Sequence, residues 1–214
     1  MSTDAMFPER LTCGYRNFLA GRFAAERSRY QQLAESGQSP SIMVIGCVDS
    51  RVSPEVIFDA APGEILVVRN VANLVPPYEQ GGQQHGTSAA LEFGVRALKV
   101  RDIVVLGHAF CGGIKAFVAG APLTASDFIG RWMSQIAPAA EALTSPKHDT
   151  DAYLRELEFA SVELSLRNLK TFPFVEAAIQ RGELSLHGAY FGVASGRMLV
   201  RDPMSGKFEP VGLG

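Results

Sequence analysis

The chain has 214 residues, of which 47% are hydrophobic and 20% are charged, so it can bury a core and is not globally disordered. Its 20 Lys and Arg residues against 22 Asp and Glu residues give a net charge of -2, which leaves no basic excess for a nucleic acid. Its 3 cysteines are too few for a disulfide scaffold, and the first residues show no signal-peptide pattern. We therefore expect a cytoplasmic protein with no membrane and no nucleic-acid partner.

The first predicted element is helical and covers about residues 10–35. Apolar side chains recur there at helical spacing: Leu11, Tyr15, Phe18, Leu19 and Phe23. We interpret residues 1–36 as an N-terminal helical arm and residues 37–214 as an α/β domain. Because an apolar stripe on a helix needs something to cover it, we expect the arm to take part in dimerisation.

Short apolar runs then alternate with helical patterns. Buried strands are predicted from unbroken apolar runs at residues 41–46, 65–68 and 102–107, and later strands at 184–193 and 197–200. Helices are predicted at residues 87–98, 113–119, 126–143 and 151–169. This alternation indicates an α/β fold with a mainly parallel sheet flanked by helices. In such sheets the ligand crevice lies beyond the carboxyl ends of the strands.

Two segments with unusual chemistry come directly after predicted strands. One is Cys47-Val-Asp-Ser-Arg51, and the other is His108-Ala-Phe-Cys111. If the two strands are neighbours, these segments face each other. Two thiols and an imidazole are typical zinc ligands, and three protein ligands leave a fourth position open for catalysis. The spacing thus favours one zinc ion bound by Cys47, His108 and Cys111.

Other interpretations of the same residues remain open at this point. A cysteine nucleophile with a histidine base is possible at Cys47 or Cys111. Asp49 and Arg51 can form an ordinary loop salt bridge or a helix cap before Pro54. The glycines between residues 107 and 113 have the spacing of a P-loop, but the Lys and the Ser or Thr that bind phosphate and magnesium are missing.

The two motifs taken together resemble those of the β-class carbonic anhydrases, most closely the plant and cyanobacterial-like branch. Further segments that match this family are Pro62–Glu64, Val68–Asn73, Val75–Tyr78, Gly112–Lys115, Asn168–Val175 and His187–Tyr190. The resemblance implies the α/β fold of that family and one zinc ion per chain. It also implies reversible hydration of carbon dioxide to bicarbonate in a homodimer or homotetramer.

The resemblance also implies roles for residues around the metal. Asp49 and Arg51 match a catalytic dyad, in which the arginine holds the carboxylate ionised and turned away from the metal. The substrate side, partly supplied by a neighbouring subunit, matches Gln38, Leu66, Val71, Phe93 and Gly112. Leu66 stands where an aromatic residue is expected, and Phe93 stands where a tyrosine is common. Both keep the pocket apolar, but a polar contact is lost with the tyrosine hydroxyl.

Val44 stands where bicarbonate-inhibited bacterial relatives carry tryptophan, so we expect no bicarbonate allostery. Arg69 and Tyr190 match other parts of that regulatory site, and we interpret both as structural. One alternative function is hydrolysis of carbonyl sulfide or carbon disulfide with the same zinc chemistry. Another is a non-catalytic zinc-binding regulatory protein, although a purely structural zinc prefers four protein ligands.

Overall fold

The computed structural model describes residues 7–81, 85–120, 128–143 and 150–212. The chain divides into two compact units, Met1–Gln38 and Ser39–Gly214. The helical pattern of the N-terminal unit is broken into three helices, which are α1 (Glu9–Ala20), α2 (Arg22–Ala25) and α3 (Arg27–Ser36). The first break falls at Gly21, whose ψ of -97° lies outside the helical range.

The N-terminal unit has its own small aromatic cluster and an exposed apolar stripe. The rings of Phe18, Phe23 and Tyr30 lie within 5.2–6.0 Å of one another, centroid to centroid. Leu11 and Tyr15, by contrast, are 54% and 60% exposed. The predicted apolar face therefore divides into residues that pack within the unit and residues that remain uncovered there.

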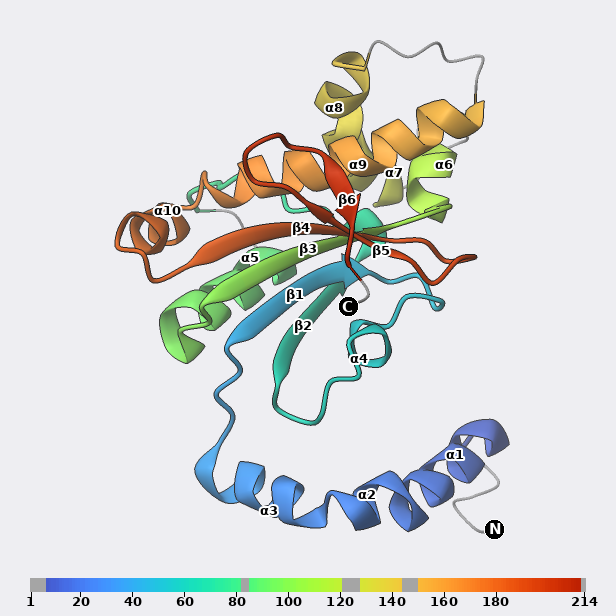
Figure 1. Cartoon of the computed structure of the whole chain (residues 1–214), viewed down its shortest axis with the longest axis vertical. Coiled ribbons are helices and arrows are strands. Elements are labelled where there is room, and N and C mark those ends of the chain that lie inside the picture. Colours follow the sequence, from blue (N-terminus) through green and yellow to red (C-terminus); the bar gives the residue numbers. More distant parts are fainter. Residues whose placement is uncertain (1–6, 82–84, 121–127, 144–149, 213–214) are drawn as a thin grey trace. The chain divides into compact units, whose positions relative to one another are not determined.

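The second unit is built on one six-stranded sheet (Figure 1). Its strands are β1 (Ile42–Cys47), β2 (Ile65–Asn70), β3 (Asp102–His108), β4 (Ser185–Phe191), β5 (Met198–Arg201) and β6 (Phe208–Pro210). The spatial order is β2-β1-β3-β4-β5-β6, in which β2, β1, β3 and β4 are parallel. Strands β5 and β6 are antiparallel to their neighbours. The predicted α/β class and mainly parallel sheet are confirmed, whereas β6 was not predicted.

The register of the central strands brings the two chemical segments to one edge of the sheet. Cys47, at the end of β1, is paired with Asn70 of β2, and Gly46 is paired with Leu106 of β3. His108 ends β3 at the same edge. Strands β1 and β3 are therefore neighbours, which is the condition under which the two segments face each other.

Helices cover the sheet and connect its strands. Those of the second unit are α4 (Pro54–Ile57), α5 (Gly86–Glu92), α6 (Gly112–Val118), α7 (Ile129–Met133), α8 (Ala137–Glu141), α9 (Thr150–Leu169) and α10 (Pro173–Gln180), with 3₁₀ turns η2 (Val71–Asn73) and η5 (Ser134–Ile136) and a π-helical segment η3 (Phe93–Leu98). Helix α9 packs along β3 and β4 (Figure 1). A Cβ added at Gly107 of β3 would lie 2.6 Å from Val162 Cγ2 of α9, so glycine permits this close approach.

Three differences from the predicted helices have local causes. The helix predicted over 87–98 changes to π-helical geometry in its second half, before the left-handed Lys99 (φ 56°). The helix predicted over 126–143 is divided among α7, η5 and α8, and its first two residues lie outside the described part. Helices α4 and α10 were not predicted, and each begins at a proline, which suits the first helical turn. In the described part of the chain, every helix is too short or too polar to cross a bilayer.

Candidate metal centre

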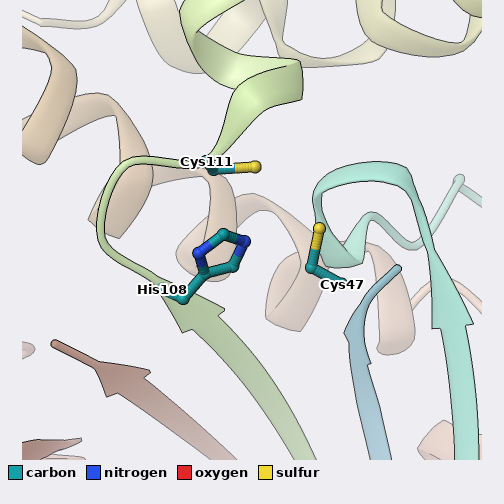
Figure 2. Close-up of side chains that lie close together, drawn as sticks. All are labelled: Cys47, His108 and Cys111. Carbon is teal, nitrogen blue, oxygen red and sulfur yellow. The ribbon is translucent and has the colours of Figure 1, made fainter. Parts of the chain in front are cut away.

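Three buried side chains converge at the carboxyl edge of the sheet. Cys47 ends β1, His108 ends β3, and Cys111 caps the start of α6. Their sulfur and nitrogen ligand atoms lie within 4.8 Å of one another. Figure 2 shows both sulfur atoms and the imidazole ring directed toward a common space. The structure thus brings together the three predicted metal ligands from two separate loops.

The hydrogen bonding of His108 prepares its ring for a metal. Its Nδ1 lies 2.9 Å from the carbonyl oxygen of Ala109, so Nδ1 carries the proton and Nε2 keeps its lone pair. Nε2 is buried and has no hydrogen-bond partner among the described residues. A buried polar atom without a partner is costly, and a coordinated cation accounts for it. This geometry and the two thiols fit zinc, whose usual ligands are thiolate and imidazole.

The two thiols share their protons unequally. Hydrogen bonding with the side chain of Cys111 lowers the pKa of the Cys47 thiol, and the same interaction raises the pKa of Cys111. The backbone amides of Asp49 and Ala72 stabilise the Cys47 thiolate further. Without metal the pair therefore favours one thiolate and one thiol. A divalent cation that binds both sulfurs must displace the remaining proton.

Asp49 and Arg51 form a bidentate ion pair beside the ligands. Asp49 Oδ1 accepts hydrogen bonds from the backbone N (3.0 Å) and Nε (2.9 Å) of Arg51, and Oδ2 accepts one from Nη2 (2.7 Å). The guanidinium holds the pKa of Asp49 well below its usual range. The Asp49 side chain is 15% exposed and that of Arg51 is 48% exposed, so the arginine lies toward solvent. The predicted pair is present.

Arg69 supports the loop that carries Cys47 and Asp49. Its Nε donates to the carbonyl oxygen of Cys47 (2.8 Å), and its Nη2 donates to that of Asp49 (2.7 Å). One guanidinium from β2 therefore fixes two backbone carbonyls of the β1–α4 loop. This contact is consistent with the structural interpretation of Arg69.

Glu158 and Tyr190 form a second polar pair, which the sequence did not reveal. Glu158 on α9 is 4% exposed, and its Oε1 accepts a hydrogen bond from the backbone N–H of Cys111 (3.0 Å). Its Oε2 accepts one from the hydroxyl of Tyr190 (2.6 Å). Burial raises the pKa of Glu158, and the Tyr190 hydroxyl opposes part of that rise. A signal was available, because Glu158 shares a helical face with Val162 and Ser165, both buried.

A groove of about 1340 Å³ reaches the end of β1, where its lining includes the residue that follows Cys47. Val48, next to Cys47, and Val71, in η2, are among its lining residues. The carbonyl oxygen of Val71 accepts a hydrogen bond from Trp132 Nε1 (2.8 Å), which fixes the η2 turn. Gly112, the predicted backbone donor, is the first residue of α6. The substrate roles of Val71 and Gly112 stay predictions.

Leu66, another predicted substrate residue, does not lie beside the metal ligands of its own chain. Leu66 is paired with Met43, four strand positions before the Cys47–Asn70 pair, which corresponds to about 13 Å along the strand. Phe93 begins η3 and is 49% exposed. Gln38 ends the N-terminal unit and is exposed. Their substrate roles stay predictions.

A mainly parallel sheet with two thiols and one imidazole at its carboxyl edge is the arrangement expected of a zinc enzyme with three protein ligands. The family model described as carbonic anhydrase matches residues 42–198. Beta carbonic anhydrase 3 of Arabidopsis thaliana is 35% identical over 193 residues, which cover 88% of this chain and 74% of the relative. Beta carbonic anhydrase 5, chloroplastic, of the same plant is 39% identical over 174 residues, which cover 79% and 56%.

Solved structures agree with these relatives. The β-carbonic anhydrase CcaA superposes with a TM-score of 0.83 at 29% identity, over 95% of this chain and 98% of that chain. The Coccomyxa β-carbonic anhydrase in complex with acetazolamide gives a TM-score of 0.78 at 30% identity, over 94% and 86%. The chain therefore belongs to the carbonic anhydrase family, in its β class, and zinc is its cofactor.

Proposed function

We propose that reversible hydration of carbon dioxide to bicarbonate, the reaction of this family, takes place at the Cys47–His108–Cys111 centre with one zinc ion per chain. The observation that carries the proposal is the convergence of three buried ligand atoms, with His108 Nε2 otherwise unpartnered among the described residues. When bound, zinc supplies the Lewis acidity that makes a hydroxide nucleophile available from water near neutral pH.

Asp49 has one acceptor position free for that nucleophile. A carboxylate offers about four lone-pair sites, and Arg51 occupies two on Oδ1 and one on Oδ2. Oδ2 can therefore accept one more hydrogen bond and orient the nucleophile toward carbon dioxide. Because both oxygens are held by Arg51, Asp49 is also kept from becoming a fourth metal ligand. The Asp49–Arg51 pair thus orients the nucleophile and leaves the fourth coordination position of the metal open.

The groove beside the ligands suits an uncharged substrate. Val48 and Val71 present apolar surface to the groove. We expect the backbone N–H of Gly112, the first residue of α6, to donate a hydrogen bond to a substrate oxygen. Gln38, Leu66 and Phe93 complete the pocket from a neighbouring subunit. The position of Leu66, four strand positions before the end of β2 that lies beside Cys47, supports this assignment for that residue.

We infer that the chain assembles with copies of itself, as a homodimer or homotetramer. A chain from the crystal structures of two tetrameric β-carbonic anhydrases of Sordaria macrospora matches with a TM-score of 0.70 at 28% identity, over 89% of this chain and 95% of that chain. The exposed stripe on α1 supports a role for the arm. Sedimentation of wild type and of Tyr15→Glu should show an oligomer that the variant weakens. Gln31→Glu, an added charge on an exposed position of α3, should leave the oligomer intact.

A cytoplasmic location also stays a prediction. It is supported by the small, odd number of cysteines, 3, because secreted proteins often carry disulfide-bonded pairs. Two of the Arabidopsis relatives are named chloroplastic and mitochondrial, so location varies among the relatives. Fractionation of the source cells with an antibody to the chain should place it with cytoplasmic markers, and enrichment in a membrane-bounded compartment would contradict the prediction.

The function is tested by zinc content and gas hydration measured on the same sample. Elemental analysis should give one zinc per chain, and stopped-flow measurement with a pH indicator should show rapid hydration of carbon dioxide. Carbonyl sulfide and carbon disulfide serve as competing substrates in the same assay. Zinc-loaded protein that hydrolyses these two and leaves carbon dioxide unchanged would favour the alternative hydrolase.

A further inference from the structure

A single peptide unit, between Phe110 and Cys111, connects the catalytic pair to the buried pair. The carbonyl oxygen of Phe110 accepts a hydrogen bond from Arg51 Nη2 (3.2 Å). The N–H of the same peptide, on Cys111, donates to Glu158 Oε1 (3.0 Å). A trans peptide is planar and carries its C=O and N–H on opposite sides. The unit is therefore held at both ends by charged side chains, 59 and 47 positions away in the sequence.

The backbone at Phe110 adopts a conformation that it would not favour alone. Its φ is 58°, in the left-handed region that a non-glycine residue rarely occupies. Its ring is 62% exposed, so packing of the side chain does little to hold that conformation. Backbone hydrogen bonds fix the residues on either side, from Ala109 N–H to the carbonyl oxygen of Phe191 (2.9 Å) and from Lys115 N–H to that of Cys111 (2.9 Å). The peptide between Phe110 and Cys111 is itself held by Arg51 and Glu158, so loss of these contacts should let it reorient and shift Cys111.

Glu158 is itself rigidly held. Its second carboxylate oxygen accepts the Tyr190 hydroxyl at 2.6 Å, and Tyr190 of β4 is 5% exposed. The Tyr190 ring lies 4.5 Å from that of Phe159, the next residue on α9. A carboxylate with one oxygen fixed by a buried tyrosine has its other oxygen directed at one place, which here is the N–H of Cys111.

We propose that Glu158, oriented by Tyr190, is a positioning residue that fixes the Phe110–Cys111 peptide and thereby aligns both the Cys111 sulfur for the metal and Arg51 for Asp49. The proposal rests on the proposed function, because it assumes a metal at the Cys47–His108–Cys111 centre. It assigns to α9 a role in the site that goes beyond packing. Groups that support a ligand in this way typically change metal affinity by about 10- to 100-fold when they are removed.

The variants are chosen to separate positioning from folding. Glu158→Leu combined with Tyr190→Phe removes both polar side chains and fills their space with apolar groups of similar size, so the fold should survive while the backbone N–H groups of Cys111 and Phe110 lose their acceptor. Glu158→Gln keeps the shape and an oxygen that can accept from Cys111, so it should act as a partial rescue. Glu156→Gln makes the same chemical change at an exposed position of α9 and serves as the matched control.

Two measurements read the metal site directly. The first is the rate at which each zinc-loaded protein releases zinc to an excess of chelator. The second is the absorption spectrum of cobalt-substituted protein, whose thiolate-to-metal bands report the geometry of the two sulfurs. We expect the double variant to release zinc about tenfold faster than wild type or more, with altered cobalt bands. Glu158→Gln should lie between, and Glu156→Gln should match wild type.

Each outcome supports the proposal or overturns it. Faster release with a thermal midpoint close to that of the control supports positioning, because loss of stability alone would lower the midpoint. Release rates and cobalt bands in the double variant that equal those of Glu156→Gln overturn the proposal. If the double variant does not fold, the same equality in Glu158→Gln and in Tyr190→Phe overturns it. Zinc-loaded wild type that fails to hydrate carbon dioxide would overturn the proposed function. The zinc-release rates and cobalt spectra of the variants would still test the positioning role of Glu158.

Discussion

Two acidic side chains contact the loops that carry the metal ligands, and their surroundings differ sharply. Asp49 faces the half-exposed guanidinium of Arg51, which stabilises its charge and holds its pKa below the usual range. Glu158 is buried against the Tyr190 hydroxyl, and burial raises its pKa. The pKa of a carboxyl group is therefore lowered in one case by a neighbouring cation and raised in the other by loss of solvent. The first environment suits a group that contacts the reacting molecules, and the second suits one that fixes the backbone.

The two pairs also differ in how far their members lie apart along the chain. Asp49 and Arg51 are two residues apart, so one loop is enough to bring them together. Glu158 and Tyr190 are 32 residues apart and meet only when α9 packs against β4. Changes in the loop that carries Asp49 and Arg51 should therefore lower kcat first. Changes in α9 should instead lower the stability of the fold and the affinity for zinc. The following predictions test that distinction.

The largest effect should come from removing a ligand that lies beside both pairs. Cys111→Ser replaces a thiolate by a hydroxyl that does not ionise near neutral pH, so zinc content should fall well below one per chain and hydration should fall to background. Elemental analysis and stopped-flow rates check this. Cys13→Ser removes an exposed thiol of α1 and should keep full zinc content. Unchanged zinc in Cys111→Ser would contradict the assignment of the centre.

Asp49→Asn should separate chemistry from metal binding. The amide is neutral and presents a donor where the carboxylate accepts, so kcat should fall by about 10²- to 10⁴-fold. Zinc content should stay at one per chain, because Asp49 is outside the group of three ligands. Asp151→Asn, at an exposed position in the first turn of α9, provides the control and should keep its rate. A nearly unchanged kcat in Asp49→Asn would remove this residue from the mechanism.

Gly107→Ala should disturb the buried contact between β3 and α9. The added Cβ would lie 2.6 Å from Val162 Cγ2, so the Val162 side chain or α9 itself must shift. Overpacking of this kind lowers the free energy of unfolding by about 1–3 kcal/mol, which denaturant titration can measure. Gly86→Ala, at a position where a Cβ meets nothing within 4 Å, should show no such loss. Equal midpoints for the two variants would mean that α9 does not depend on this close approach.

The smallest effect should come from breaking a surface ion pair whose members, like Asp49 and Arg51, are two positions apart in the sequence. Arg181 and Glu183 are 57% and 59% exposed, and the arginine lowers the pKa of Glu183. A lowered carboxyl pKa gives stability that is present above its unfolded value of about 4.3 and is lost as the pH falls through its folded value. Glu183→Gln should therefore lower the thermal midpoint slightly at pH 7, with no difference from wild type in strong acid. The kcat for carbon dioxide hydration should not change. A clear loss of kcat would show that a surface ion pair far from the metal ligands influences the reaction.

The candidate site was predictable where its residues are close in sequence or follow strands with a clear pattern. The apolar runs that became β1 and β3 predicted two neighbouring strand ends, so Cys47 and the His108–Cys111 segment could be placed together. Glu158 escaped this reasoning, because its partners Cys111 and Tyr190 are 47 and 32 positions away. Its charge at a buried position of α9 was a signal, but helical periodicity alone does not identify a partner.

The sequence by itself determined the α/β class, the ligand set and the Asp49–Arg51 pair, because strand periodicity, residue chemistry and short spacing are local properties. The tertiary structure alone decided which groups support those ligands, including Arg69 on the Cys47 carbonyl and Glu158 on the Cys111 amide. It also decided that Leu66 lies four strand positions from the Cys47–Asn70 pair, away from the metal ligands of the same chain. The physical reason is that hydrogen bonds between distant elements depend on register and packing, which no short segment encodes.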